Sequence, residues 1–420
     1  RLLPLVHKHG LQVIAIDDCS NLDIEQTPFA TLLQEFSGAA MPRAEVTLED
    51  HATIMYTSGS TGHPKGALSS HRGILSALYS WMCLGVTTKM VGSQEARETG
   101  LAPAALITIP LFHCTASHSA FLLSLVVGRK MVIMHKWDAE EALRLIESER
   151  VTWFNGVPTM SAELQAAAEH TDRDISSLTE IMAGGAARPS EQVRKISGTF
   201  KKSAPGIGYG LTETNAIGAG IFSTNYLEKP NSTGAPSKPL VDLAILDDAG
   251  KSVPQGERGE VSIRSVALFS GYWNRPDATA DCMTSDGYFR TGDIGYLDAD
   301  NYLFIVDRKK DIIIRGGENI SCQEVEAEIY KHPAVAEACV FGLPDERLGE
   351  VVGAVVYCHP GQSVTSDALS DFLKSQLAAF KLPQQIWIAD DPLPRLGTEK
   401  IDKVALRKAY REIWAATPKA

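Results

Sequence analysis

Residues 56–66 have the composition of a loop that binds an anion. The segment reads YTSGSTGHPKG and holds three glycines, four serine or threonine side chains, one proline and one lysine. Glycines let the backbone come close to a polyphosphate, hydroxyl groups donate hydrogen bonds, and a lysine supplies positive charge. The candidate phosphate-binding residues are Thr57, Ser58, Gly59, Ser60, Thr61, Gly62 and Lys65.

This loop differs from the P-loop of ordinary ATPases. In that motif, GxxxxGK[ST], the lysine directly follows the second glycine and a hydroxyl residue comes next. Here Lys65 comes three residues after Gly62 and is followed by Gly66. A flexible surface turn is the alternative interpretation, because short motifs also match by chance. The flanking runs, ATIMY before and ALSSHRGILSALYSWM after, predict a strand and a helix, a setting in which backbone N–H groups bind anions.

Five further stretches combine glycine turns with polar or charged side chains. IMAGGA (181–186) ends a strand-like run, and GIGYGLTE (206–213) packs three glycines around a tyrosine. YFRTGDIG (288–295) exposes a carboxylate in a tight turn. DRKKDIIIRGGENIS (307–321) and PRLGTEK (394–400) place lysines near glycines. Together, the six stretches disfavour the interpretation of residues 56–66 as a mere surface turn.

The order of these stretches resembles the adenylate-forming (AMP-binding) superfamily, and most of all its acyl-CoA synthetases of the fatty-acid–CoA ligase type. The resemblance extends from about residue 50 to about residue 410. It implies ATP-dependent activation of a carboxylic acid to an acyl-adenylate with release of pyrophosphate, followed by transfer to CoA. ATP, CoA and the acid are then substrates, and Mg²⁺ is the cofactor. We expect a fatty acid first and an aromatic acid second.

The resemblance also implies a role for each matching residue. The 57–65 loop would bind the β- and γ-phosphates, Thr212 the α-phosphate, and Glu213 the Mg²⁺ ion, since a hard cation prefers oxygen ligands. Lys400 would reach the substrate carboxylate and the α-phosphate from a small second domain. The residues matched to adenine and ribose are Gly184, Gly185, Ala186, Tyr209, Asp293 and Arg308.

The second half-reaction would use other residues. DRKKD matches the interdomain hinge of the family, with Lys310 at the pivot, although a solvated charge run is the plainer interpretation. Gly316 and Gly317 would let the pantetheine arm of CoA approach. His113 matches a position beside the acyl pocket and the CoA tunnel, or it is a core histidine. Two interpretations, acyl-pocket wall or core at a strand end, stay open for Trp153, Phe154, Val157 and Pro158.

The elements that must position these residues indicate an α/β fold. Strand-like runs at 13–16, 53–56, 105–110 and 130–134 alternate with helical patterns such as 138–150, which favours a mostly parallel sheet. We expect a large N-terminal domain of mixed or parallel sheets with helices, residues 1–308, that includes a β-rich subdomain from about 230 to 308. A small, mobile α+β domain, residues 309–420, follows, and Ser321 caps its first helix.

Bulk composition narrows the function classes. The 420 residues carry a net charge of -11, which argues against nucleic acid as a partner and against a polybasic membrane surface. No apolar run is long enough to span a bilayer. The seven cysteines are dispersed and form no CxxC pair, so we expect reduced thiols and a cytoplasmic enzyme. Association into a homodimer is left open.

The sequence departs from the family pattern at two points, and two competing functions stay open. Glu399 stands where the family usually has glycine before the terminal lysine, and much of the family's N-terminal region has no counterpart here, as in a truncated chain. The first competing function is an aryl- or aminoacyl-adenylating enzyme that loads a carrier protein. The second is a non-catalytic nucleotide-binding relative or an inactive fragment. A luciferase-like oxygenase is disfavoured by the GGENI sequence.

Overall fold

The computed structural model describes residues 3–16, 25–57, 64–91, 100–397 and 400–416. The chain forms two compact units, Arg1–Thr47 and Leu48–Ala420. The first unit holds helices α1 (Leu3–His9) and α2 (Phe29–Glu35) and a parallel pair of strands, β1 (Val13–Ala15) and β2 (Gln26–Pro28). The strand predicted over 13–16 is thus confirmed.

A seven-stranded sheet forms the centre of the second unit, with the order β11-β10-β9-β8-β7-β5-β6. Five strands, β6, β5, β7, β8 and β9, run parallel to one another. β10 runs antiparallel to β9, and β11 runs antiparallel to β10. This sheet confirms the α/β class and the mostly parallel arrangement. The bounds are β5 Ala104–Ile107, β6 Lys130–Ile133, β7 Trp153–Gly156, β8 Glu180–Gly184, β9 Ala204–Tyr209, β10 Ala219–Phe222 and β11 Ala235–Pro236.

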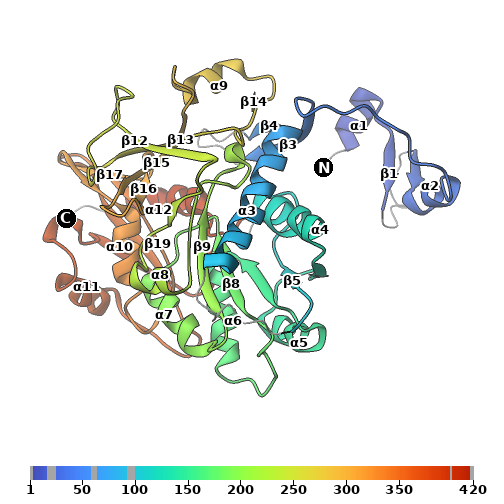
Figure 1. Cartoon of the computed structure of the whole chain (residues 1–420). Helices are drawn as coiled ribbons and strands as arrows, with labels where there is room; N and C mark the ends of the chain where they lie inside the picture. Colours follow the sequence, from blue (N-terminus) through green and yellow to red (C-terminus); the bar gives the residue numbers. More distant parts are fainter. Residues whose placement is uncertain (1–2, 17–24, 58–63, 92–99, 398–399, 417–420) are drawn as a thin grey trace. The chain divides into compact units, whose positions relative to one another are not determined.

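The main core of this unit lies between the sheet and the crossover helices α5 (Ala139–Glu149), α6 (Pro158–Ala168) and α7 (Ser190–Thr199), drawn in green in Figure 1. Asp138 caps α5 by accepting a 2.8 Å hydrogen bond from the backbone N–H of Glu141. Parallel strands need crossovers of this kind, which place helices on the sheet faces. The carboxyl ends of β7, β8 and β9 therefore meet at one edge of the sheet.

The described residues on either side of the Gly-rich loop pair as two antiparallel strands, so the helix predicted after the loop is confirmed but begins four residues later than expected. β3 (His51–Thr57) pairs antiparallel with β4 (Lys65–Ser70), which also pairs with β14 (Gly271–Tyr272). Helix α3 begins only at His71 and ends at Val91. Pairing on both sides satisfies the backbone groups of residues 65–70 in a sheet, which local sequence patterns cannot reveal. Residues 58–63 lie outside the described residues.

Four antiparallel strands form the predicted β-rich segment. β12 (Val241–Leu246), β13 (Gly259–Ser265), β15 (Phe289–Leu297) and β16 (Leu303–Arg308) follow one another in the sheet. The sequence runs DDAG (247–250) and LDADNY (297–302) lie after β12 and between β15 and β16. The remaining helical elements between β5 and β15 are the π-helix η1 (Thr115–Leu122), α4 (Leu123–Val127), the 3₁₀ turn η2 (Thr212–Thr214), α8 (Ser223–Glu228) and α9 (Pro276–Cys282).

The C-terminal part is a sheet covered on both faces. Alternate residues of β19 point to opposite sides: Ala338 and Val340 pack with α10 and α11, whereas Cys339 and Phe341 pack with α12. In Figure 1 these elements are orange to red. The bounds are β17 Ile313–Arg315, β18 Glu318–Ile320, α10 Cys322–Ile329, β19 Val335–Asp345, β20 Gly349–Cys358, α11 Ser366–Lys374, η3 Ala379–Lys381, β21 Gln385–Ala389 and α12 Lys403–Ala416.

No helix in the described ranges combines the length and the apolar character needed to cross a membrane.

Candidate functional site

Two glycine turns meet at the carboxyl edge of the central sheet. β8 and β9 are parallel neighbours, and Gly184 lies opposite Gly208, so the turn after β8 lies beside Tyr209. Gly185 has a φ of +78°, a conformation that glycine adopts without strain. Ligands of open α/β sheets bind at such carboxyl edges, where strand ends leave a crevice. The predicted adenine residues therefore lie where the fold offers a ligand site.

Lys400 reaches this edge from the C-terminal part of the chain. A Cβ atom placed on Gly185 would lie 2.9 Å from Nζ of Lys400 and 3.0 Å from its Cε. The lysine lies at the end of a short hairpin in which Leu396 N donates to Lys400 O over 2.8 Å. Burial lowers the pKa of the Lys400 ammonium, and Arg308 lowers it further, whereas Cys114 opposes the change. Glu399 lies outside the described residues.

Asp293 is the centre of a second polar group beside the same turn. Its carboxylate is 3% exposed and accepts a 2.7 Å hydrogen bond from Tyr209 Oη, while Arg308 Nε lies 3.0 Å from its other oxygen. Asp293 and Arg308 stand opposite each other on β15 and β16. Burial raises the pKa of the Asp293 carboxyl, and the guanidinium of Arg308 and the hydroxyl of Tyr209 oppose that rise.

Thr212 and Glu213 lie on the 3₁₀ turn η2, directly after β9. Thr214 Oγ1 accepts from Leu211 N at 3.0 Å, and Asn215 then takes a left-handed φ of 50°. Asn215 is itself held by His118, whose Nε2 lies 3.1 Å from its Oδ1. Thr212 Oγ1 lies 3.9 Å from the buried thiol of Cys114. The turn is therefore fixed by its neighbours rather than free to move.

Tyr272 connects Glu213 to the lysine of the Gly-rich hairpin. The hydroxyl of Tyr272 donates a 2.7 Å hydrogen bond to Glu213 Oε1, and Lys65 Nζ lies 4.9 Å from the centre of the tyrosine ring. Phe269 packs edge-on against the ring, with 4.9 Å between centroids. Sequence reasoning missed Tyr272, because the short strand β14 that carries it has no motif.

Glu213 fits a magnesium ion that is bound chiefly through phosphate oxygens. Its side chain is 7% exposed, and the hydrogen bond from Tyr272 fixes the carboxylate without using the lone pairs of Oε2. Protein sites for Mg²⁺ often supply only one or two carboxylates and leave the other positions to phosphates and water. In the described part of the chain, no group of three or more His, Cys, Asp or Glu residues is placed to hold a metal alone.

His113 is half-buried and has a buried ring nitrogen. Within the described residues, its Nε2 has no hydrogen-bond partner. Burial lowers the pKa of its imidazole, and the positive charge of Lys400 lowers it further. By contrast, Phe154 and Val157 belong to the hydrophobic core, and Trp153 and Pro158 are also buried, which supports the core interpretation for this segment.

The residues predicted to act as hinge and to contact CoA lie in the C-terminal sheet and in the segment that leads to it. Gly316 and Gly317, with φ of 57° and 92°, form the two-residue turn between β17 and β18, and Gly316 N donates to Leu348 O at 2.7 Å. Lys310 is exposed and follows Arg308 after β16. Among the contacts of the described residues, none links this glycine pair to Asp293, Gly185 or Lys400.

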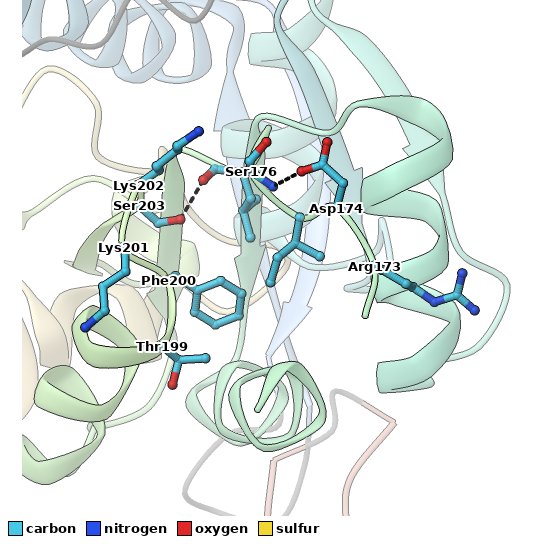
Figure 2. A pocket seen from close by; sticks show the side chains of 10 residues that line it. Arg173, Asp174, Ser176, Thr199, Phe200, Lys201, Lys202 and Ser203 are labelled. Carbon is cyan, nitrogen blue, oxygen red and sulfur yellow. Dashed lines mark hydrogen bonds between the residues drawn. The ribbon is translucent and has the colours of Figure 1, made fainter. Parts of the chain in front are cut away.

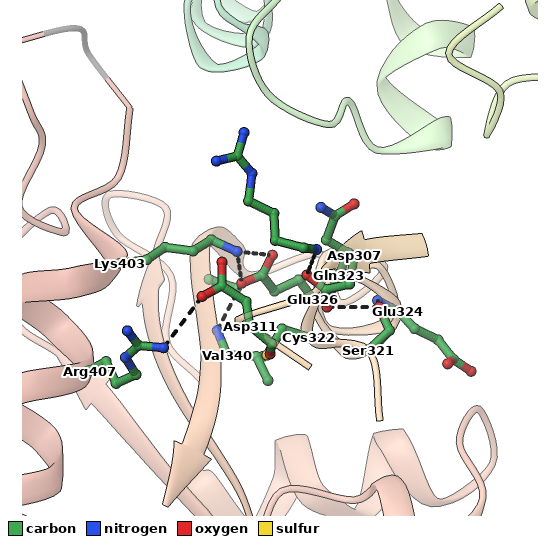
Figure 3. A network of polar contacts seen from close by, with 12 residues as sticks. Asp307, Asp311, Ser321, Cys322, Gln323, Glu324, Glu326, Val340, Lys403 and Arg407 are labelled. Carbon is green, nitrogen blue, oxygen red and sulfur yellow. Dashed lines mark hydrogen bonds and ion pairs between the residues drawn. The ribbon is translucent and has the colours of Figure 1, made fainter. Parts of the chain in front are cut away.

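A polar network surrounds the start of α10, next to the predicted hinge (Figure 3). Asp307 accepts hydrogen bonds from Ser321 Oγ at 3.1 Å and from Gln323 N at 3.2 Å. Ser321 caps the helix, as predicted, by accepting from Glu324 N. Lys403 donates to Glu326 at 2.7 Å. The end of β16 is thereby attached to the first helix of the C-terminal part.

A shallow pocket of about 280 Å³ lies away from this site (Figure 2). Its walls are the loops that precede β8 and β9, so it lies at the amino ends of those strands, opposite the edge that carries Gly185. Ser203 Oγ donates to Leu178 O, and Ser176 N donates to Asp174, so these wall groups bond to one another. We do not include this pocket in the candidate site.

The chain matches known families and proteins over most of its length. The family model described as "AMP-binding enzyme" matches residues 5–273, and that of the "AMP-binding enzyme C-terminal domain" matches residues 324–400. A feruloyl-CoA synthase of an Amycolatopsis species is 36% identical over 88% of this chain and 72% of that protein. The long-chain-fatty-acid–CoA ligase FadD13 of Mycobacterium tuberculosis is 35% identical over 89% of this chain and 70% of the ligase.

Solved structures agree with these relatives. ATP-bound MatB from Rhodopseudomonas palustris superimposes with a TM-score of 0.79 at 29% identity, covering 91% of this chain and 73% of MatB. The o-succinylbenzoate CoA synthetase MenE from Bacillus subtilis, in complex with its acyl-adenylate intermediate, also gives a TM-score of 0.79, at 28% identity, and covers 96% of this chain and 80% of MenE.

Proposed function

Because the chain belongs to the family of AMP-binding enzymes and is an AMP-forming acid–thiol ligase of the acyl-CoA synthetase type, we propose that it activates a fatty acid with ATP and transfers it to CoA. The observation that carries this proposal is the contact between Lys400 and Gly185. It joins a lysine of the C-terminal part to the sheet edge at which Tyr209, Asp293 and Arg308 also meet.

We assign the nucleotide as follows. The adenine lies against Gly184, Gly185, Ala186 and Tyr209. Its ribose hydroxyls donate to Asp293, whose oxygens each have two lone-pair positions and so can accept bonds besides those from Tyr209 and Arg308. Thr212 binds the α-phosphate. The β- and γ-phosphates lie along the β3–β4 hairpin, with Lys65 at its described end. Residues 58–62 of this assignment lie outside the described residues.

The first half-reaction requires little acid–base chemistry. A carboxylic acid with an ordinary pKa of about 4.3 is already an anion at neutral pH. One carboxylate oxygen forms a bond to the α-phosphorus, the bond from that phosphorus to the bridging oxygen breaks, and pyrophosphate leaves. The chief obstacle is repulsion between two anions. Lys400 reduces it by placing positive charge where negative charge accumulates. Mg²⁺, when bound with ATP near Glu213, would supply further neutralisation.

The second half-reaction replaces the adenylate with a thioester. The CoA thiol gives its proton to water, its sulfur forms a bond to the acyl carbon, the bond from that carbon to the phosphate oxygen breaks, and AMP leaves. We assign the CoA approach to the turn Gly316–Gly317 and to His113, with rotation at Lys310 bringing the turn to the site. Cytoplasmic location and dimer formation stay predictions.

The acyl chain is the least constrained part of the proposal. A Cβ atom placed on Gly208 would meet no atom within 4 Å, so the site has open space beside β9. An aromatic acid is the second candidate, because feruloyl-CoA synthase is among the relatives. Pyrophosphate exchange with octanoate, palmitate, benzoate and ferulate tests both candidates. Addition of CoA or of a carrier protein to the best acid then identifies the acceptor. Wild-type protein that exchanges pyrophosphate with none of these acids would contradict the proposal.

A further inference from the structure

The hairpin that carries Lys400 is attached to the rest of the molecule through Arg395. Arg395 pairs with Ile401 at the base of this hairpin. Its guanidinium Nη2 lies 2.5 Å from Glu337 Oε1 on β19 and 3.2 Å from Glu163 Oε1 on α6. One side chain therefore contacts both the C-terminal sheet and a helix of the central sheet's core, 232 residues earlier in the chain.

If the C-terminal part rotated, the carboxylate of Glu337 would move with Arg395, whereas that of Glu163 would not. Glu337 is 7% exposed on its side chain, and its Oε2 accepts a 2.7 Å hydrogen bond from Leu393 N. Glu337, Leu393 and Arg395 all belong to the C-terminal part, so they can move together. Glu163 belongs to the other side. The Arg395–Glu163 contact is therefore the part of this cluster that a rotation must break.

The Glu163 carboxylate is held by a second side chain besides Arg395. Its Oε2 accepts a 2.5 Å hydrogen bond from the indole Nε1 of Trp137, and the Trp137 ring packs 5.8 Å from that of Phe154. Phe154 is fully buried in the main core. The carboxylate thus has a fixed direction that does not depend on Arg395. A charged pair with one preorganised partner loses less side-chain entropy on forming than a pair of two flexible ones.

We propose that Glu163 is a positioning residue that, through Arg395, docks the Lys400 hairpin onto the central sheet and favours adenylate formation over thiol transfer. This inference rests on the proposed function, because it assigns Lys400 to the first half-reaction. Glu163 does not touch the nucleotide in this account. It acts by fixing the hairpin base while Lys400 Nζ lies at Gly185.

The test separates the two half-reactions. Glu163→Gln removes the charge but keeps an oxygen that can accept from Trp137. Pyrophosphate exchange should become about threefold to fivefold slower, as expected for a partly exposed ion pair. The chemically prepared adenylate of the best acid should be converted by CoA at the wild-type rate or faster. Glu191→Gln, at an exposed i,i+3 pair with Arg194, is the matched control and should change neither rate.

Trp137→Phe is the second variant, since it keeps an aromatic ring against Phe154 and removes the N–H donor together with part of the indole volume. It should slow exchange in the same direction and to a smaller extent. If Glu163→Gln fails to fold, the rates of the two half-reactions in Trp137→Phe test the inference instead. Equal slowing of both half-reactions, or no change in either, would overturn the inference. A wild-type protein that lacks pyrophosphate exchange would instead refute the proposed function, so the two failures can be told apart.

Discussion

Asp293 illustrates how a buried carboxylate can stay useful as an acceptor. Burial alone would favour its neutral form, yet Arg308 and Tyr209 place a positive charge and a hydroxyl donor on its two oxygens. The carboxylate is thereby oriented from both sides. A ribose that donates to it would meet an acceptor whose direction is already fixed, which lowers the entropic cost of binding.

Tyr272 provides a prediction at this scale. Tyr272→Phe removes the hydrogen bond to Glu213 Oε1 but keeps the ring beneath Lys65. Hydrogen bonds to charged groups contribute about 1.5–3 kcal/mol, so we expect the MgATP concentration at half-maximal pyrophosphate exchange to rise about tenfold or more. The concentration of acid at half-maximal rate should stay unchanged. Steady-state exchange at varied MgATP measures both.

Tyr288→Phe is the matched control for that experiment. Tyr288 also donates a 2.7 Å hydrogen bond to a carboxylate, that of Asp242, but on the exposed face of the β-rich sheet. This variant should bind MgATP as the wild type does. Equal effects of the two substitutions, or a Tyr272→Phe effect on the acid alone, would show that Tyr272 does not act through Glu213.

The residues of the site differed in how well the sequence revealed them. Motif order made Gly185, Asp293 and Lys400 recognisable. Asp293, however, is buried in strand β15 and not exposed in a tight turn as predicted, because β15 pairs with β16 at this position. Tyr272 and Glu163 were not recognisable, because their partners come from distant segments. Tyr272 meets Glu213 across 59 positions, and Arg395 meets Glu163 across 232. Such pairs depend on tertiary packing, and a single sequence carries no local signal for them.

At the scale of the elements, the turn after β8 gives a prediction for Gly185. Gly185→Ala would place a Cβ 2.9 Å from Lys400 Nζ in a backbone with φ of +78°. Gly361→Ala imposes the same φ of +78°, with no atom within 4 Å of the new Cβ. Both variants should lose roughly 1–2 kcal/mol of stability from backbone strain. Only Gly185→Ala should also slow pyrophosphate exchange, by tenfold or more.

Thermal unfolding and exchange assays on the two variants separate strain from contact. An exchange rate in Gly185→Ala that matches that of Gly361→Ala would mean that the turn does not need to accommodate Lys400. The comparison is informative because both glycines have the same backbone conformation and differ in their surroundings.

Asp307, at the end of β16, gives a prediction on pH. Burial raises the pKa of its carboxyl to about 6, with Lys403 and the N–H groups of Arg308 and Gln323 opposing and Glu326 adding to the rise. The folded protein thus keeps a proton that the unfolded chain loses near pH 4. The stabilising effect of that proton is complete below about pH 4 and is lost as the pH rises through about 6.

Asp307→Asn removes this titration. The difference in unfolding midpoint, wild type minus variant, should therefore decrease between pH 4 and pH 7, by an amount on the order of 3 kcal/mol in free energy if the variant keeps its other contacts. Thermal unfolding at pH 4.5, 5.5 and 7 measures it. A difference that is flat or increases with pH would contradict the raised pKa.

The elements themselves were largely predictable, with one instructive exception. Alternation of apolar runs and amphipathic helices gave the parallel strands β5 to β8, because each buried strand has a strong local pattern. The residues 67–70 were predicted as the start of a helix and belong to the strand β4. Their small side chains fit either structure, and their pairing with β3 and the distant β14 decides between them.

At the scale of the whole molecule, the two proposed half-reactions require two arrangements of one chain. The structure has Lys400 at Gly185, the arrangement that suits adenylate formation, while the turn Gly316–Gly317 contacts its own sheet. Thiol transfer would need the C-terminal part to turn at Lys310. The network at Asp307, Ser321 and Gln323 attaches β16 to α10, so it must open or move during that rotation. The boundary at 308–309 stays a prediction.

The sequence predicted an α/β molecule with a β-rich segment and a C-terminal α+β part, and the order of its motifs pointed to one nucleotide site. It did not predict how the C-terminal part docks, because charged pairs such as Arg395–Glu163 have no periodic pattern. It also did not predict which acid fits the open space beside Gly208, because no local pattern in the sequence identifies the residues around that space.

Pyrophosphate exchange by Lys400→Ala tests the central claim most directly. The claim is that this lysine neutralises charge at a nucleotide bound to the carboxyl edge of β8 and β9. Lys374→Ala, at an exposed lysine of α11 paired with Asp371, is the control and should exchange pyrophosphate at the wild-type rate. Lys400→Ala should exchange on the order of 10²–10³ times more slowly, with ATP affinity much less affected. A wild-type rate in Lys400→Ala would contradict the account.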